Sequence, residues 1–271
     1  MADFLAQAQA QPATTVLAVA LAALFPALLR RDVGLSYSAV VEHRELWRCF
    51  VAQVAHVDLI HLAFNLSALW SIGIVERTQE LGTLYYLKTT ALLFLLSPAM
   101  TLLLYHLLIH MAHKPEYAHT SAVGYSCVLF GWMALLSSPR HPGGITMLPV
   151  FGLASVPAWA TPWASLVITS LLIPSASFIG HLGGMLAGYL VALGTFQFLS
   201  AGWVLGLFGW AALGLGWAAA RSRELVPYIR LPSSIAGLGG GGSGSGDVES
   251  GGSGSGGGKV RIGANGEILR G

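Results

Sequence analysis

The chain has 271 residues, of which only 10% are charged and 54% are hydrophobic, and its formal net charge is +2. An average soluble domain has about 25% charged residues, so this composition excludes an ordinary water-soluble protein. The basic residues form no stripe, which argues against a nucleic-acid partner. The two cysteines, Cys49 and Cys127, form no CxxC motif and cannot make a disulfide framework. The composition predicts an integral membrane protein.

The first fifteen residues, Met1 to Thr15, contain Asp3 and no lysine or arginine. They therefore have neither the basic region of a secretory signal nor the arginine-rich pattern of a transit peptide. We expect the first apolar segment itself to direct insertion into the membrane.

Long apolar runs recur along the chain, and a spanning helix needs about 20 such residues. The fifth run is short and crowded by Pro157, Pro162 and Pro174, so a core or re-entrant helix is the alternative there. The predicted spans cover residues 14–30, 57–75, 83–108, 120–138, 161–175, 178–198 and 201–220.

Two segments outside these runs have a character of their own. The loop from Arg31 to Ala55 is amphipathic and contains Trp47, a residue type that favours membrane interfaces. The stretch from Gly239 to Gly258 is almost wholly glycine and serine, which predicts a flexible linker. Lys259 to Gly271 is expected to be an exposed peptide that could recruit a protein partner. We therefore predict a membrane domain over 1–222 and a disordered tail over 223–271.

Polar side chains within the apolar runs are costly and each suggests a function. In the second run, His61 and Asn65 are four residues apart and share one helical face, and His56 precedes them near the membrane edge. In the fourth run, Ser126 follows Gly124, whose small size allows close backbone approach.

The sixth run brings a histidine together with glycines. His181 shares a helical face with Gly184 and Gly188, the spacing of small residues that lets membrane helices pack closely. A hydrogen bond between Ser126 and His181 on separate helices requires such an approach. A serine among glycines is by itself more often a packing residue, and lone histidines could instead line a pore.

A second group of histidines ends the third run. His106, His110 and His113 have offsets of four and seven and could gather a metal on one helical face. They lie beside Lys114 and Glu116 and form no HExxH motif, so interfacial, solvated histidines are the better interpretation. The sequence predicts no metal site.

The motifs taken together resemble the rhomboid family of intramembrane proteases, from about Trp47 to Gly194. Within the family, Ser126-Cys-Val-Leu-Phe-Gly131 and Ala176-Ser-Phe-Ile-Gly-His181 are most similar to the plant rhomboid-like proteins and the endoplasmic-reticulum branch of animals. The residues that carry the resemblance are Trp47-Arg48, His56-Val-Asp-Leu-Ile-His61-Leu-Ala-Phe-Asn65, Gly73, Glu76, Gly82, Gly124-Tyr-Ser126 and Gly180-His181-Leu-Gly-Gly184-Met-Leu-Ala-Gly188.

The resemblance implies an all-α polytopic membrane protein with a six-helix core, its catalytic part about 47–194, to which the run at 201–220 adds a seventh, C-terminal span. It implies an intramembrane serine endopeptidase that cuts transmembrane segments of proteins in the bilayer and uses no cofactor. An endomembrane, the endoplasmic reticulum or the Golgi, is the expected location, with another organelle as the alternative. The positive charges of the loops do not settle the orientation in the membrane, because the positive-inside rule disagrees with the orientation that the family resemblance implies.

The resemblance also assigns roles to the polar residues. Ser126 would be the nucleophile and His181 the general base, with no third carboxylate. His61, Asn65 and the backbone N–H of Ser126 would stabilise the oxyanion, supported by His56, Gly124, Gly184 and Gly188.

The simplest roles for the remaining motif residues are structural. Glu76 would satisfy loop amides or pair locally, and Gly82 would be a turn glycine or a helix-entry glycine. Trp47 and Arg48 would be interfacial anchors.

Two residues depart from the family pattern. Cys127 follows the nucleophile where many members have glycine, and Gly180 stands where alanine commonly precedes the histidine. Successive helical residues point about 100° apart, so Cys127 should not compete with Ser126 for His181.

The sequence leaves two other classes of function to consider. A catalytically inactive rhomboid-like protein would bind transmembrane clients in membrane-protein quality control, but the presence of both Ser126 and His181 argues against it. A small transporter would have inverted repeats, and none is apparent in the sequence.

Overall fold

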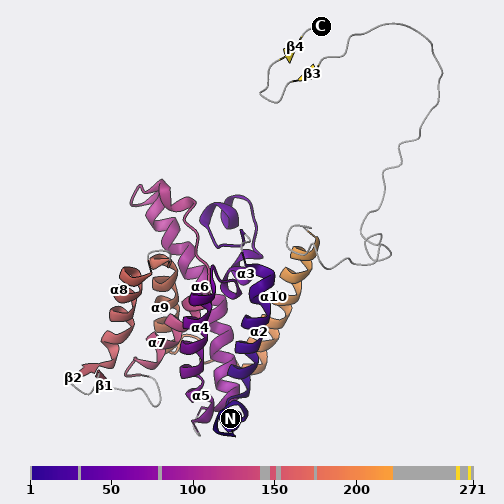
Figure 1. Ribbon diagram of the computed structural model, residues 1–271. Helices are drawn as coiled ribbons and strands as arrows, with labels where there is room; N and C mark the ends of the chain where they lie inside the picture. Colours follow the sequence, from indigo (N-terminus) through magenta and orange to yellow (C-terminus); the bar gives the residue numbers. More distant parts are fainter. Residues whose placement is uncertain are drawn as a thin grey trace, which may run out of the picture. The chain divides into compact units, whose positions relative to one another are not determined.

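The computed structural model describes residues 2–29, 32–78, 81–140, 147–150, 154–173, 176–221, 261–262 and 268–269. The chain divides into two units, Met1–Pro227 and Tyr228–Gly271. Among the described residues of the first unit, the regular structure is helical apart from one pair of short strands (Figure 1).

The chain begins with two helices that meet at a sharp bend. Helix α1 spans Ala2–Ala10 and helix α2 spans Pro12–Leu28, and their axes differ by 102°. The proline at the first position of α2 lacks the N–H that a helix start leaves unpaired in any case. The short helix α1 was not predicted from the sequence.

Glu76 supplies the partners that the start of α2 needs. Its carboxylate accepts hydrogen bonds from the N–H groups of Ala13 at 3.0 Å and Thr14 at 2.7 Å, and from the Thr14 hydroxyl at 2.6 Å. A negative charge is stabilising at a helix N-terminus. The expected structural role of Glu76 is confirmed, although its partners are distant helix amides and not local loop amides.

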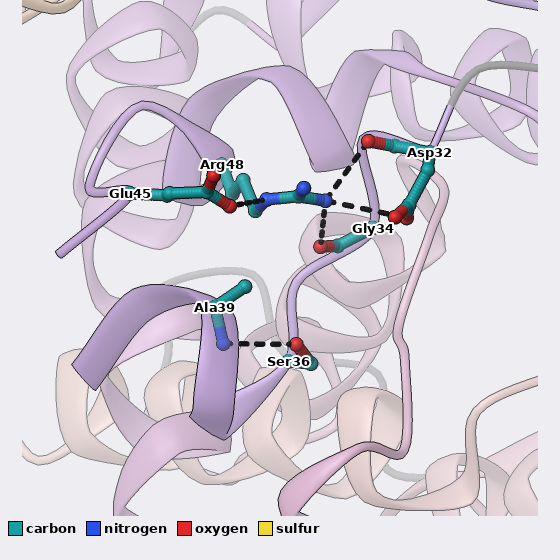
Figure 2. A network of polar contacts seen from close by, with 6 residues as sticks. All are labelled: Asp32, Gly34, Ser36, Ala39, Glu45 and Arg48. Carbon is teal, nitrogen blue, oxygen red and sulfur yellow. Dashed lines mark hydrogen bonds and ion pairs between the residues drawn. The ribbon is translucent and has the colours of Figure 1, made fainter. Parts of the chain in front are cut away.

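The loop between α2 and α4 folds around one buried arginine. It contains a short π-helix, η1 (Ser38–Glu42), and helix α3 (Arg48–Val54). Figure 2 shows the Arg48 guanidinium between Glu45 and Asp32, with further bonds to the carbonyl oxygens of Asp32 at 3.0 Å and Gly34 at 3.1 Å. Arg48 is 8% exposed and Trp47 is 9% exposed, so the prediction that both are interfacial anchors is wrong. The buried guanidinium of Arg48 needs several hydrogen-bond partners, and it takes them from Glu45 and from the start of the loop.

The two longest apolar helices follow. Helix α4 (Leu59–Ile72) and the short helix α5 (Ile74–Arg77) form one apolar stretch, and helix α6 spans Gly82–His110. Gly82 has a φ of +72°, which confirms that it opens α6 in a conformation that favours glycine. A 3-10 helix, η2 (Pro115–Ala118), follows α6.

Four further helices complete the first unit, with a two-stranded antiparallel sheet between the first two of them. The sheet pairs β1 with β2 in the register Met147 to Pro157, and the 3-10 helix η3 (Ala158–Ala160) follows it. The elements are α7 (Ser126–Leu136), β1 (Met147–Val150), β2 (Ala154–Pro157), α8 (Thr161–Leu172), α9 (Phe178–Ala192) and α10 (Ala201–Arg221).

Helix α6 packs against α2, α3, α5, α7, α9 and α10 and so forms the centre of the bundle (Figure 1). At the α6–α7 contact the rings of Tyr86 and Trp132 stack at 5.3 Å, both fully buried. The Trp132 indole N–H donates to the Thr90 hydroxyl at 3.1 Å. The large ring is therefore buried with its polar group paired.

Helices lie in all seven predicted spans. By length and composition, Leu59–Arg77 and Gly82–His110 can cross a membrane, and the bent pair α1–α2 can be a third span. Helices α7 and α9, and the part of α10 from Ala201 to Gly214, are apolar but shorter. The fourth helix begins at Ser126 and not near residue 120 as predicted. The arrangement of six core spans and a seventh remains a prediction.

The second unit contains two strands, β3 (Arg261–Ile262) and β4 (Ile268–Leu269), which pair antiparallel. The predicted linker from Gly239 to Gly258 lies outside the described residues, as does most of the predicted tail.

Candidate active site

Ser126 is the first residue of α7 and lies two residues after a glycine in an unusual conformation. Gly124 has a φ of +117°, and a Cβ atom there would meet the His61 ring. The sequence Gly124-Tyr125-Ser126 therefore turns the chain sharply into the helix. The first N–H groups of a helix have no intrahelical acceptor, and the helix dipole is positive at this end. Ser126 thus lies where a developing negative charge would be stabilised.

His181 lies in the first turn of α9, which Ser177 caps. The Ser177 hydroxyl oxygen accepts from the N–H of Gly180 at 3.0 Å. This start directs the His181 ring toward α7, where Nε2 lies 2.8 Å from Oγ of Ser126. The two residues are 55 positions apart in the sequence, and His181 is only 3% exposed.

The His181 ring is held by stacking. The ring of Phe130 lies 4.2 Å from it with an interplanar angle of 18°. Within the described residues, Nδ1 of His181 has no hydrogen-bond partner. The orientation of the imidazole therefore comes from packing and from the serine and not from a carboxylate.

Glycines bring α7 and α9 close enough for this contact. A Cβ atom at Gly184 would overlap the carbonyl oxygen of Cys127, and one at Gly188 would overlap that of Gly131. On another face of α9, a Cβ atom at Gly183 would overlap Thr101 of α6. The predicted role of Gly184 and Gly188 in close helix packing is confirmed.

His61, Asn65 and His56 lie on the other side of Ser126. The Asp58 side chain caps α4 by accepting from the N–H of His61 at 2.7 Å, and the His61 ring rests against Gly124. One N–H of the Asn65 side-chain amide donates to the His61 carbonyl at 2.8 Å. The amide group has a second N–H.

His56 precedes α4 and packs edge-on against His61, with ring centroids 5.2 Å apart. Burial, together with the neighbouring His61, lowers the pKa of His56 to about 4. The ring is therefore neutral near pH 7, so it adds no positive charge beside His61.

Cys127 turns away from the dyad, as the sequence predicts. Its thiol lies 3.4 Å from Oε1 of Gln53 and 3.6 Å from the Gly124 carbonyl oxygen. Gln53 is itself buried and donates to the carbonyl oxygens of Cys49 at 2.6 Å and Phe94 at 2.8 Å. The thiol therefore fits into a small polar cluster between α3, α6 and α7.

A cleft of about 410 Å³ opens onto Ser126 and His181. Its walls come from α4, α7 and α8, with Asn65 on one side and Ser165 and Ile168 on the other. The remaining lining is mainly apolar and includes Phe64, Leu129, Phe130 and Met133. On the other side of Ser126 lies a space of only about 20 Å³, beside Gln53. The cleft is therefore the larger approach to the serine.

The histidines at the end of α6 lie close to one another and to Tyr37. No group of three or more histidine, cysteine or acidic ligands suited to a metal occurs among the described residues. The hydroxyl of Tyr37 instead lies 2.9 Å from His106 and 3.3 Å from His110. Both histidines are exposed, in keeping with the interpretation as solvated residues.

Three contributors to this site were missed from the sequence: Phe130, Gln53 and Ser177. Phe130 follows Ser126 by four residues and so lies on the same helical face, which was a usable signal. Ser177 stands three residues before Gly180 at the start of an apolar run, the pattern of a helix cap. Gln53 gives no comparable signal.

Comparison with known proteins agrees with the geometry. A family model for the rhomboid domain matches residues 43–198. The chain is 34% identical over 172 residues to Rhomboid-like protein 15 of Arabidopsis thaliana, covering 61% of this chain and 40% of that protein. It is 32% identical over 169 residues to Rhomboid-like protein 14, mitochondrial, of the same plant, covering 61% and 49%.

A third relative carries an activity in its name. The chain is 30% identical over 183 residues to Rhomboid-type serine protease 2 of Saccharomyces cerevisiae, covering 66% of each. The chain thus spans about half or less of the length of the plant relatives and two-thirds of the yeast one. Since the family model covers more than half of the chain, with apolar helices through the matched region, this protein is a multi-pass membrane protein of the rhomboid family.

Proposed function

We propose that this protein is an intramembrane serine endopeptidase that cuts transmembrane segments with Ser126 and His181. The observation that carries the proposal is the 2.8 Å contact between Oγ of Ser126 and Nε2 of His181, made between two helices inside an apolar bundle. A free serine is a poor nucleophile and needs an adjacent base of this kind.

The proposed reaction follows from these positions. Oγ of Ser126 attacks the carbonyl carbon of the scissile peptide while Nε2 of His181 takes its proton. His181 then returns the proton to the leaving amine as the C–N bond breaks. A water molecule, activated by the same histidine, hydrolyses the acyl-enzyme and restores the serine.

The oxyanion of the tetrahedral intermediate needs fixed donors in a site of low dielectric constant. The backbone N–H of Ser126 at the start of α7, the His61 imidazole and the second N–H of the Asn65 amide are the proposed donors. Their nearness supports this assignment, because Gly124 brings the His61 ring beside the serine.

The substrates would be single transmembrane segments with locally weak helicity. An intact helix hides its carbonyl groups in internal hydrogen bonds, which must open before Ser126 can attack. The apolar lining of the 410 Å³ cleft suits such a segment.

We further propose that the protein acts in an endomembrane, the endoplasmic reticulum or the Golgi, on the strength of the family resemblance. One similar plant protein is named mitochondrial, so mitochondria are the competing location. Microscopy of the tagged chain against markers of the three membranes separates them, and a mitochondrial signal would overturn this part.

The test of the activity is labelling with a serine-directed fluorophosphonate, followed by mapping of the modified residue. We expect labelling of Ser126 that is lost in Ser126→Ala and His181→Ala, together with all substrate cleavage. His61→Ala and Asn65→Ala should lower turnover by about 10²–10³ each while retaining some labelling.

Two results would contradict the proposal. One is folded, lipid-embedded wild-type protein that takes no label, and the other is labelling that survives His181→Ala unchanged. Either would favour a rhomboid-like protein that binds transmembrane clients without cutting them.

A further inference from the structure

A second pocket, of about 140 Å³, lies at the other end of α7 from Ser126. It is formed between α6, the end of α7 and the turn that follows α9. Two basic residues line it, Lys88 from α6 and Arg140 from just beyond α7. No carboxylate is among its lining residues within the part of the chain that the structure describes, and neither side chain takes part in the ion pairs found there.

The position of Lys88 along α6 sets the depth of the pocket. The 29 residues of α6 extend about 43 Å at 1.5 Å per residue, and the hydrocarbon core is about 30 Å thick. Lys88 lies six residues after Gly82, about 9 Å from the start of the helix. In a helix centred on the bilayer, this position falls at the border between hydrocarbon and headgroups, where the phosphates of lipids lie.

The walls of the pocket have two characters. Gln197 and Thr89 add polar groups beside the two cations, whereas Leu92, Val191 and Phe196 give an apolar wall. Gly194, with a φ of +82°, turns the chain after α9 so that the Gln197 side chain folds back against it. The pocket is thus polar and cationic on one side and apolar on the other.

We propose that this pocket binds the phosphate group of an anionic phospholipid, with the acyl chains along its apolar wall. Basic pockets between transmembrane helices bind anionic headgroups in this way. A volume of 140 Å³ corresponds to about four or five waters at about 30 Å³ each, enough for the five heavy atoms of a phosphate group. Arg140 can form paired hydrogen bonds to phosphate oxygens, and Lys88 supplies a point charge.

The test is native mass spectrometry of the purified full chain in detergent, titrated with phosphatidic acid or with phosphatidylcholine. Phosphatidic acid should bind at least about tenfold more tightly than phosphatidylcholine. Lys88→Gln and Arg140→Gln should each weaken phosphatidic acid at least about fivefold and leave phosphatidylcholine unchanged.

Two control variants separate a site from general surface charge. Arg77→Gln removes an exposed positive charge at the same end of the bundle but outside the pocket, and should leave binding within about twofold. Lys88→Arg keeps the positive charge and should also leave binding within about twofold. It therefore tests the role of the charge even if Lys88→Gln unfolds. Thermal unfolding of each variant without lipid reports folding independently.

Three results would overturn the proposal. They are equal binding of the two lipids, an Arg77→Gln loss as large as that of Lys88→Gln, and displacement of the lipid by inorganic phosphate at matched concentration. The last would identify a free anion, and not a lipid, as the ligand. Because the readout is lipid binding, failure of the proteolytic function would leave this test intact.

Discussion

Helices α7 and α8 both line the approach to Ser126, yet they are packed in opposite ways. In α7, every residue from Val128 to Leu135 except Met133 is buried, and its backbone touches that of α9 through glycines. In α8, Leu166 is buried but Trp163, Val167 and Leu171 are exposed. One wall of the site is therefore set by contacts between backbones, the other by a few side chains.

The difference assigns the two helices different tasks. Backbone contacts cannot adjust by changing rotamers, so the distance between Ser126 and His181 is fixed by the fold. A helix with few buried apolar contacts opens at a low free-energy cost. For the activity proposed above, α7 and α9 would fix the geometry of Ser126 and His181, whereas α8 would move at a lower free-energy cost.

The largest effect should come from Gly184→Val. Its side chain would meet the Cys127 carbonyl, which is backbone and has no alternative rotamer. Overpacking costs about 1–3 kcal/mol or more, and a 1 Å misplacement of catalytic groups can cost about 10²-fold in rate. We expect fluorophosphonate labelling to be lost together with thermal stability.

The matched control is Gly206→Val in α10, where a Cβ atom meets nothing within 4 Å. This variant should label at the wild-type rate. Loss of labelling in both variants would show that any valine in these helices is harmful. Wild-type labelling in both would show that valine is tolerated at Gly184, and either result would remove the argument for close α7–α9 packing.

A smaller and more selective effect is expected from Ser165→Trp, which fills the cleft from the α8 side. Cleavage of a transmembrane substrate should fall at least about tenfold, equivalent to about 1.4 kcal/mol. Labelling by the small fluorophosphonate should persist, because the dyad is untouched. Leu171→Trp, on the exposed face of the same helix, is the control and should cleave normally. Parallel loss of cleavage and labelling in Ser165→Trp would mean that α8 supports the dyad itself.

The smallest effect should follow Phe130→Ala, which removes the ring stacked on His181. Aromatic pairs contribute about 0.5–1.5 kcal/mol, or about two- to tenfold in rate if all of it serves to orient the imidazole. Labelling kinetics of the folded protein measure this, and Phe130→Tyr should retain the wild-type rate. An unchanged rate in Phe130→Ala would show that Ser126 and the backbone suffice to hold the ring.

The sequence was informative where small residues follow helical spacing. The glycines after His181 predicted the close packing of α9, and the structure confirms it at Gly184 and Gly188. The apolar runs located the helices because a bilayer demands long apolar stretches. The fourth run misled at its start, because Gly124 turns the chain at a φ of +117° and delays α7 to Ser126.

Long-range polar partners were beyond reach. Glu76 caps a helix 62 residues away, and Arg48 lies among loop carbonyls that no residue type marks in advance. Gln53 likewise looks like an ordinary polar residue until the fold brings it to Cys127. Such partners depend on tertiary position, which local periodicity does not encode.

The shortness of α7 bears on the fate of whatever is cut. Its eleven residues measure about 16 Å, roughly half of a 30 Å hydrocarbon core, with Ser126 at one end and Arg140 beyond the other. In the proposed reaction, a substrate helix of bilayer length that lies alongside α7, with its end level with the far end of α7, would be cut near its middle. Each fragment would keep about ten apolar residues, where about twenty are needed to span the bilayer. Under the proposed activity, neither half would then be long enough to span the bilayer as a helix by itself.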